Sequence, residues 1–374
     1  MFKKIFLIYS ILILFSFVSF ASGGDKHEAD SVKKFGMGDL NNLIMHHVKD
    51  AHEWEILSYH NAAGEEVPVI VPLPIILIAN GQIDVFMSSA FEENGKVTKG
   101  NNTYINHHGK IYLANDKGEL TVEKNDKGEE KITSATPWDF SISKNVVSML
   151  LACLIILAIF LTTAKICKKN NGRPRGVQSV MEPVILYIRD NVLRPSLGDK
   201  TEKFLPYLMT VFFFILFNDL LGIVPFFPGN ANVTGNISVT LTLAFFTFIA
   251  INFNGSKHYW HHTFWMPGIP VFVKPILTIV EVMSIFIKPI ALMIRLFANI
   301  TAGHIIILSL VGLLFLFQWV MSPVSVIFVL FMDIIEILVA FLQAYIFTLL
   351  SAVFIGLAID PGHDSKHKEV VHNA

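Results

Sequence analysis

The chain has 374 residues, of which 53% are hydrophobic and only 16% are charged, and its mean hydropathy is +0.54. This composition excludes an ordinary soluble enzyme and indicates a membrane protein with several spans. The net charge of −1 gives no indication of nucleic-acid binding, and the two cysteines, Cys153 and Cys167, suggest no disulfide framework.

Residues 1–21 have the pattern of a secretory signal peptide. Two lysines precede an apolar run that ends at Phe20, and Ser19-Phe20-Ala21 resembles a small-residue cleavage site. The alternative is an uncleaved first span, but the polar residues that follow favour cleavage. We therefore expect residues 22–143 to form an exported, periplasmic region.

The exported region contains two patterns. Leu40–Leu57 has a helical pattern, and an ordinary amphipathic segment is favoured over a metal site formed by His46, His47 and His52. Between Val67 and Ile132, short apolar runs alternate with hairpin-type turn sequences, which are Asn80-Gly81, Asn94-Gly95, His108-Gly109 and Asp116-Lys117-Gly118. The second pattern predicts a small β-containing element of unknown role.

The first three membrane helices are predicted between residues 144 and 253. Val146–Ala164 is an apolar run of spanning length, and the basic residues after it place its far end in the cytoplasm. Residues 176–203 are amphipathic and predict an interfacial helix on the cytoplasmic side. Leu205–Pro225 and Ile237–Phe253 predict the second and third spans, and Asn218 and Asp219 lie near the outer end of the second.

The segment Asn254–Pro270 predicts a loop that is rich in histidine and aromatic residues. An aromatic belt at the cytoplasmic membrane surface is favoured over a metal site formed by His258, His261 and His262.

Two oversized apolar stretches follow, Val271–Val320 and Val324–Ile359. As a helix the second alone would be roughly 54 Å long, against a hydrocarbon core of about 30 Å, so it must tilt or bend. We expect an all-α polytopic membrane protein with about five membrane helices, two of them long, tilted and paired as a hairpin. This membrane domain would occupy residues 144–360, between the small β-containing exported region and a cytoplasmic tail at 361–374.

The first long stretch carries one arginine, Arg295. A charged arginine at the membrane centre costs about 2.5–3.5 kcal/mol on translocon-type scales, so the chain must use the charge. On an ideal helix, four polar side chains fall within roughly 40° of Arg295, whereas His304 falls about 180° away. The four are Glu281, Ser284, Lys288 and Asn299. A single arginine is compatible with a structural salt bridge, but a stripe of five polar residues favours an ion path.

The second long stretch carries a matching stripe of Asp333, Glu336 and Gln343, and the small residues Ala340 and Ala344 permit close helix approach. Such ionisable and hydrogen-bonding groups can pass a proton in short steps. An arginine guanidinium stays protonated, so Arg295 would block a direct leak and attract a carboxylate of a partner. The arrangement suggests two offset half-paths separated by this arginine.

Two other classes of protein would leave different signs in the sequence. A secondary transporter that binds an anion with Arg295 predicts internal repeats with broken helices, and none is evident. A membrane metalloenzyme predicts two or more histidines on one face of a span, but the predicted spans hold only His304.

The segment Arg295-Leu-Phe-x-Asn299-x-x-Ala302-Gly303-His304, with Glu336 and Gln343-Ala344 downstream, resembles the signature of subunit a of the F-type ATP synthase. The segments 218–225 and 239–244 resemble the second-span and third-span motifs of that family. The resemblance covers about residues 136–360, and the long N-terminal region is similar to that of members from the Bacteroidetes.

The resemblance implies a non-catalytic, proton-translocating subunit of the inner-membrane sector, without a cofactor, that contacts the c-ring and subunit b. It implies that Arg295 faces the c-ring carboxylate and that His304 and Glu336 form the acid–base pair of the outer half-channel. Asn299 and Gln343 would line the same channel, and Glu281 and Ser284 match positions of the cytoplasmic half-channel.

Two departures from the bacterial pattern accompany this resemblance. Many bacterial members place Glu first and His second in the acid–base pair, whereas here His304 precedes Glu336, as in mitochondrial members. Ala291 stands where relatives often carry a polar residue, so that position contributes no hydroxyl. Protons are the expected coupling ion.

Overall fold

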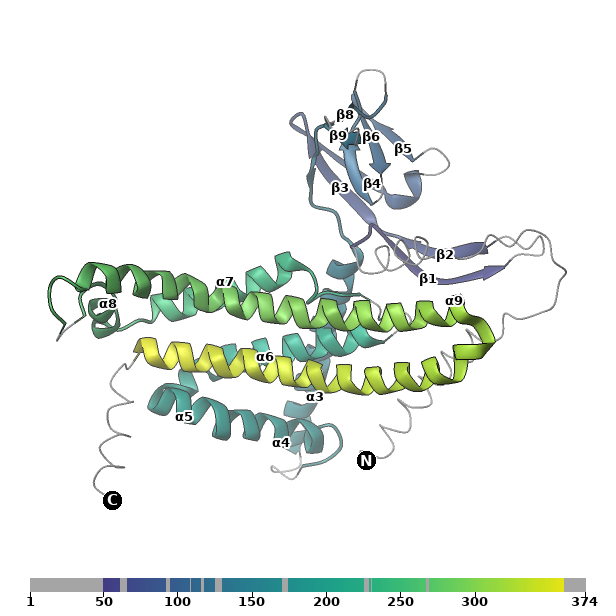
Figure 1. Cartoon of the computed structure of the whole chain (residues 1–374). Coiled ribbons are helices and arrows are strands. Elements are labelled where there is room, and N and C mark those ends of the chain that lie inside the picture. The colour runs from purple at the N-terminus through teal and green to yellow at the C-terminus, as the bar shows by residue number, and fades with distance from the viewer. Residues whose placement is uncertain are drawn as a thin grey trace. The chain divides into compact units, whose positions relative to one another are not determined.

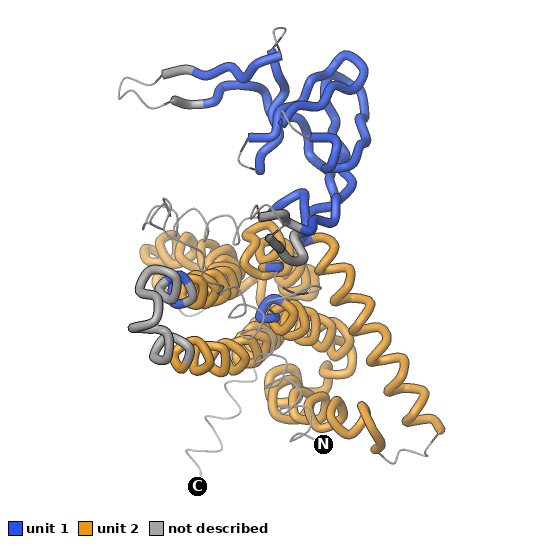
Figure 2. The backbone as a smooth tube through the Cα atoms, turned by 90° about the vertical axis from the view of Figure 1, so that its right-hand side faces the viewer, with its two compact units in different colours: residues 1–145, 222–231, 309–325 blue, residues 146–221, 232–308, 326–374 orange. Residues whose placement is uncertain are grey.

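The computed structural model describes residues 50–60, 66–91, 95–107, 109–115, 118–124, 130–169, 174–224, 229, 231–266 and 269–359. It has two compact units (Figure 2): the first comprises residues 1–145, 222–231 and 309–325, and the second comprises 146–221, 232–308 and 326–374. The expected signal peptide at 1–21, His46, His47 and the tail at 361–374 lie outside the described residues.

The first unit contains the strands, all paired antiparallel (Figure 1). A two-stranded ribbon is formed by β1 (Glu53–His60) and β2 (Glu66–Pro72). A three-stranded sheet has the order β10-β3-β4, with β10 (Trp138–Asp139), β3 (Pro74–Ala79) and β4 (Gln82–Met87). A second such sheet has the order β5-β6-β7, with β5 (Lys96–Lys99), β6 (Asn102–His107) and β7 (Lys110–Leu113). The last pair is β8 (Val122–Lys124) with β9 (Glu130–Ile132), and η1 (Ser88–Phe91) is a short 3₁₀ turn.

The β-containing element predicted from the turn sequences is therefore present. Asn80 and Gly81 join β3 to β4 with φ values of 51° and 76°, which is the left-handed pair that an Asn-Gly hairpin turn requires. Gly109, at φ 81°, turns the chain between β6 and β7. The expectation of a helix over Leu40–Leu57 is wrong for residues 53–57, because these residues pair with β2 in strand β1. Pairing with the next strand along the chain overrides the local helical pattern.

The core of this element lies between the two three-stranded sheets. Ile75, Leu77 and Phe86 from one sheet pack with Val97, Tyr104 and Ile111 from the other. The fully buried Tyr104 donates its hydroxyl hydrogen to Asp84 Oδ2 at 2.7 Å, and Asn102 Nδ2 donates to the same oxygen at 3.1 Å. Burial, followed by the hydrogen bond to Asp84, raises the pKa of Tyr104 to about 12.

Replacing Tyr104 with phenylalanine removes only the hydroxyl from this network. We expect Tyr104→Phe to destabilise the element by about 1–2 kcal/mol, because the half-buried Asp84 carboxylate loses a donor. Hydrogen–deuterium exchange of the full chain should show faster exchange in β3, β4 and β6. The matched control is Tyr112→Phe, since the Tyr112 hydroxyl makes no hydrogen bond within the described residues. Equal exchange in both variants would contradict the structural role.

The second unit is helical (Figure 1). Its long helices are α3 (Lys144–Lys169), α6 (Thr201–Ile223), α7 (Ile237–Phe253) and α9 (Lys274–Ile359). Between α3 and α6 lie α4 (Gln178–Ile188), a π-helical turn η2 (Arg189–Leu193), α5 (Arg194–Leu197) and a 3₁₀ turn η3 (Gly198–Lys200). The helix expected over 176–203 is thus present in segments, and its interfacial position stays a prediction.

One apolar core joins the helices of this unit. It includes Ile188 and Val192 from the α4 region, Leu208 and Phe212 from α6, and Phe347 from α9. Backbones also approach closely: a Cβ placed on Gly356 would lie 2.0 Å from the Ser196 carbonyl oxygen, so only glycine fits there.

The segment Asn254–Pro270 is not wholly a loop. It contains the helix α8 (Lys257–Phe264), whose first turn is capped by Ser256, since Ser256 Oγ accepts a hydrogen bond from the Tyr259 amide at 3.1 Å. The prediction of a loop is wrong for these residues, because it did not recognise Ser256 as the N-terminal cap of a helix. The aromatic belt proposed for the same segment stays a prediction.

Four helices within the described residues are long and apolar enough to cross a membrane, and the bent pair α7 and α8 makes up to five. The fold class expected from the sequence, a largely helical membrane protein of about five spans with a small β-containing region, is therefore confirmed. Helix α9 contributes two of these candidates, Lys274–Leu310 and Ile327–Ile359. The two arms run side by side in Figure 1, green and yellow, so the expected hairpin is present.

Candidate functional site

The two arms of α9 have a fixed antiparallel register. Asn299 Nδ2 donates a hydrogen bond to Gln343 Oε1 at 2.7 Å. His304 Nδ1 lies 3.7 Å from Glu336 Oε1, and Lys288 Nζ lies 5.6 Å from the centre of the Phe354 ring. Moving toward the bend along one arm corresponds to moving toward the bend along the other. These contacts therefore show which residues of the two arms face each other along the hairpin.

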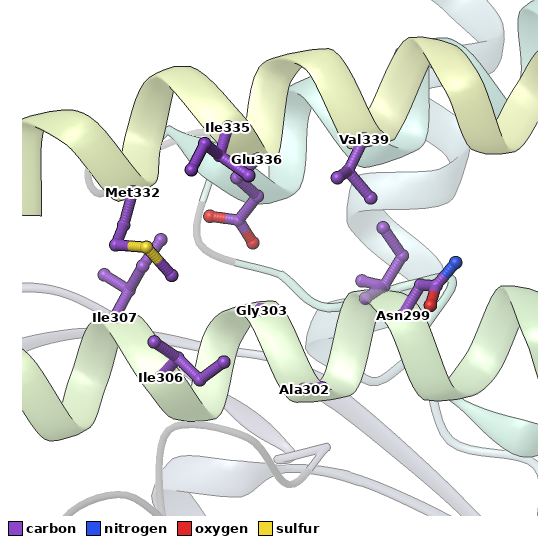
Figure 3. A pocket seen from close by; sticks show the side chains of 10 residues that line it. Asn299, Ala302, Gly303, Ile306, Ile307, Met332, Ile335, Glu336 and Val339 are labelled. Carbon is purple, nitrogen blue, oxygen red and sulfur yellow. The ribbon is translucent and has the colours of Figure 1, made fainter.

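Glu336 lies at the centre of a small hollow between the arms (Figure 3). Asn299, Gly303 and Val339 line the hollow beside it, and aliphatic side chains close the rest. A Cβ placed on Gly303 would lie 3.0 Å from Glu336 Oε1, tighter than most side chains tolerate. Gly303 is therefore what allows the carboxylate to approach the facing helix.

The carboxylate of Glu336 is only 6% exposed, and within the described residues its Oε1 atom makes no hydrogen bond. At 3.7 Å from His304 Nδ1, it is beyond a direct hydrogen bond, but a small side-chain rotation would close the gap. A buried carboxyl group beside an imidazole can exchange a proton with it. Asp333, one helical turn before Glu336, adds a second half-buried carboxyl group close to the hollow.

A third carboxyl group, Asp219 at the end of α6, belongs to the same neighbourhood. It is 2% exposed, it interacts electrostatically with Glu336, and its Oδ1 accepts a hydrogen bond from Thr234 Oγ1 at 2.5 Å. Its Oδ2 has no hydrogen-bond partner within the described residues. The sequence placed Asp219 near the outer end of a span without assigning it a role, although an acidic residue in an apolar helix is itself an indication of function.

Arg295 points away from the seam between the arms. The buried side chains Ile285, Leu292, Leu296 and Ile300 mark the seam on this arm. Because successive helical residues are about 100° apart, Arg295 lies about a quarter turn from Leu296. The guanidinium is exposed, and it makes no ion pair or hydrogen bond within the described residues. It is flanked on its surface by the small residues Ala291, Ala298 and Ala302.

The helical wheel had placed Asn299 and His304 on opposite faces. Both side chains nevertheless contact the second arm of α9, because the seam lies between them on the helix surface. Asn299 reaches across from one side of the seam and His304 from the other.

Of the predicted site residues, the structure brings together His304, Glu336, Asn299 and Gln343. Glu281 and Ser284 are half-buried and lie elsewhere on the same arm, beyond Arg295. From helix geometry, Arg295 is about 14 Å from the level of His304 and about 21 Å from that of Glu281. Arg295 therefore stands between two separate polar groups.

Metal binding was the alternative for the histidine-rich segment. In the part of the chain that the structure describes, no group of three or more His, Cys, Asp or Glu side chains could hold a metal ion. His258, His261 and His262 thus do not form such a group, and His46 and His47 lie outside the described residues.

Several apolar helices of spanning length, with the buried carboxyl group of Glu336 between two of them, define a polytopic membrane protein. The model of the ATP synthase A chain family matches residues 146–356, and the chain belongs to this family. The resemblance to subunit a of the F-type ATP synthase is thereby confirmed.

Similar proteins support the same assignment. The chain is 46% identical over 230 residues to "ATP synthase subunit a" of Chloroherpeton thalassium, covering 59% of this chain and 68% of that protein. It is 46% identical over 246 residues to "ATP synthase subunit a" of Chlorobium phaeobacteroides strain BS1, covering 61% and 69%. The protein of the same name from Myxococcus xanthus is 40% identical over 234 residues, covering 60% and 75%.

A second family model, described as a domain of unknown function, matches residues 43–140. All the strands from β1 to β10 therefore fall within a family to which no role is attached.

Proposed function

We propose that this chain is the proton-translocating subunit of an ATP synthase membrane sector, providing two offset half-channels separated by Arg295. In this role it couples proton flow to ATP synthesis without catalysing the chemical step. It would contact the rotating c-ring and subunit b in the cell inner membrane, with its N-terminal region in the periplasm and its C-terminus in the cytoplasm. The family assignment supports the general role.

The observation that carries the proposal is the guanidinium of Arg295, which is exposed on an apolar helix surface and has no ion-pair partner among the residues that the structure describes. A permanent charge at membrane depth is costly unless an opposite charge meets it. Within the described residues no carboxylate of this chain pairs with the Arg295 guanidinium, so a carboxylate on a partner is the simplest source. The alanines around Arg295 leave room for a partner helix to come close.

The outer half-channel would be built from the buried groups between the arms and α6. A proton would pass among Asp219, Glu336 and His304, with Asn299 and Gln343 holding the lining in place through their hydrogen bond. The partner carboxylate would receive the proton next to Arg295. Glu281 and Ser284, on the other side of Arg295, would line the cytoplasmic half-channel.

The proposal is tested by the requirement for the chain in proton pumping. Inverted membrane vesicles from cells that lack the chain should hydrolyse ATP without acidifying, and supplying the full chain should restore acidification. A proton-conducting uncoupler, added at the end, should collapse the restored gradient. Acidification by vesicles that lack the chain would show that the proton path lies elsewhere.

Asp219 gives a sharper prediction for the outer half-channel. Asp219→Asn keeps the shape of the side chain but removes the ionisable group, and we expect acidification to slow by about tenfold, which corresponds to about 1.4 kcal/mol. Thr234→Val, which removes the hydrogen bond to Asp219, should cause a smaller loss. Thr242→Val is the control, because among the described residues the Thr242 hydroxyl bonds only within its own helix, to the Ser238 carbonyl oxygen. If Asp219→Asn pumps at the unaltered rate, Asp219 is not on the path.

A further inference from the structure

The outer face of the β10-β3-β4 sheet is apolar throughout. Register pairs Pro74 with Met87, Ile76 with Val85 and Ile78 with Ile83, and it places Trp138 beside Ile78. Phe140, whose amide bonds to the Ile76 carbonyl oxygen, completes the set. We call these eight residues the apolar sheet face.

This face is on the side of the sheet away from the core. The alternate residues Ile75, Leu77 and Ala79 of β3 are buried against the second sheet, so the neighbours Pro74, Ile76 and Ile78 point outward. Trp138 is 75% exposed, Ile83 67% and Phe140 60%. An antiparallel sheet with one solvated side normally alternates apolar and polar residues, and an apolar patch of this kind marks an interaction surface.

The face is close in sequence to the start of a candidate membrane span. Phe140 is four residues before Lys144, the first residue of α3, which is at most about 14 Å of chain. The chain is hydrogen-bonded to the first unit as far as Lys144, because Ile142 N donates to the Pro74 carbonyl oxygen and Lys144 N to that of Ala51. Lys144 and Asn145 accordingly belong to the same compact unit as the sheet.

Two side-chain contacts reinforce this junction. Asp50 accepts hydrogen bonds from Ser143 Oγ at 2.7 Å and from the Asn145 amide at 3.2 Å, which caps the first turn of α3. His52 Nε2 lies 2.9 Å from Asp139 Oδ2 in β10. Burial acts to raise the pKa of Asp139, but hydrogen bonds from His52 and Ser141 outweigh it and lower the pKa to about 2.

We propose that the apolar sheet face rests on the lipid bilayer surface, at the leaflet that α3 enters. Trp138 is a residue type that concentrates at membrane interfaces, and Phe140 beside it is apolar. The apolar run of α3 begins at Val146, so the acyl boundary lies within a few residues of them. A protein–protein interface contains about one hydrogen bond per 100–200 Å² of buried surface. The eight side chains of the face offer almost none, which favours lipid over a protein partner.

The proposal is tested by spin labels in the assembled complex, reconstituted into vesicles of phosphatidylcholine and phosphatidylglycerol. Single cysteines replace Trp138 or Ile83 in a background in which Cys153 and Cys167 are changed to serine. Lys110→Cys, exposed on β7, is the aqueous control, and Leu154→Cys, exposed on α3, is the lipid control. Collision of the label with oxygen reports lipid, and collision with a water-soluble nickel complex reports water.

Labels at 138 and 83 should lose nickel accessibility relative to 110 and keep oxygen accessibility, as the label at 154 does. Nickel accessibility equal to that at 110 would place the face in water and overturn the proposal. Low accessibility to both reagents would also overturn it, because the face would then be covered by protein, either another subunit or residues 22–49 of this chain.

Discussion

Arg295→Ala is expected to abolish ATP-driven proton pumping while the complex still assembles. We expect at least about a 100-fold loss, corresponding to about 2.7 kcal/mol, because the fixed charge that would meet the partner carboxylate is gone. Assembly should survive, since the guanidinium is exposed and contacts no charged group within the described residues. The measurement is acidification of inverted vesicles, with c-ring association checked in the same membranes.

The matched control for this arginine is Arg194→Ala. Arg194 Nη1 lies 3.0 Å from Asp190 Oδ1 in an exposed pair, and such surface pairs contribute about 0–1 kcal/mol. This variant should pump almost as well as the unaltered chain. Normal pumping by Arg295→Ala would mean that the arginine is structural and that the half-channel proposal is wrong in its central part.

Exchanging His304 and Glu336 should retain more pumping than either single replacement. In His304→Glu with Glu336→His, one imidazole and one carboxyl group still face each other across the arms. Each single change instead places either two carboxyl groups or two imidazole groups about 3–4 Å apart, and two such groups repel each other when both are charged. Acidification rates of the two single variants and the double variant, measured in matched vesicles, give the coupling between the positions.

The geometry limits how complete this rescue can be. Gly303 leaves room for the Glu336 carboxylate, and a histidine at 336 is bulkier, so the double variant should fall below the unaltered chain. Two single variants as active as the unaltered chain would contradict a paired role, and a double variant no better than the weaker single would contradict direct contact.

The helical hairpin could be expected from the sequence because its evidence is local. Polar residues in long apolar stretches stand out at any spacing, and the motif around Arg295 is specific enough to identify the family. The Asn80-Gly81 turn is similarly local, since its backbone conformation depends on the two residues themselves.

Contacts between distant segments could not be obtained in this way. The hydrogen bond from Thr234 to Asp219 joins a connecting segment to the end of α6, and no periodicity links the two positions. Strand β1 was missed for a related reason, because its residues have a helical pattern and become a strand only when β2 is beside them. The apolar sheet face needed the register of three strands before its residues could be recognised as neighbours.

The register of the α9 hairpin limits where residues can be inserted into this chain or its relatives. Inserting one residue between Lys288 and His304, or between Glu336 and Phe354, would advance one part of that arm by about 1.5 Å and rotate it by about 100°. The contacts that the two arms make across the seam could then not all be kept. An insertion between the arms, in residues 311–326, would leave every facing pair in place. Variation in length should therefore be confined to the bend, while both arms keep an invariant residue count between Lys288 and His304 and between Glu336 and Phe354.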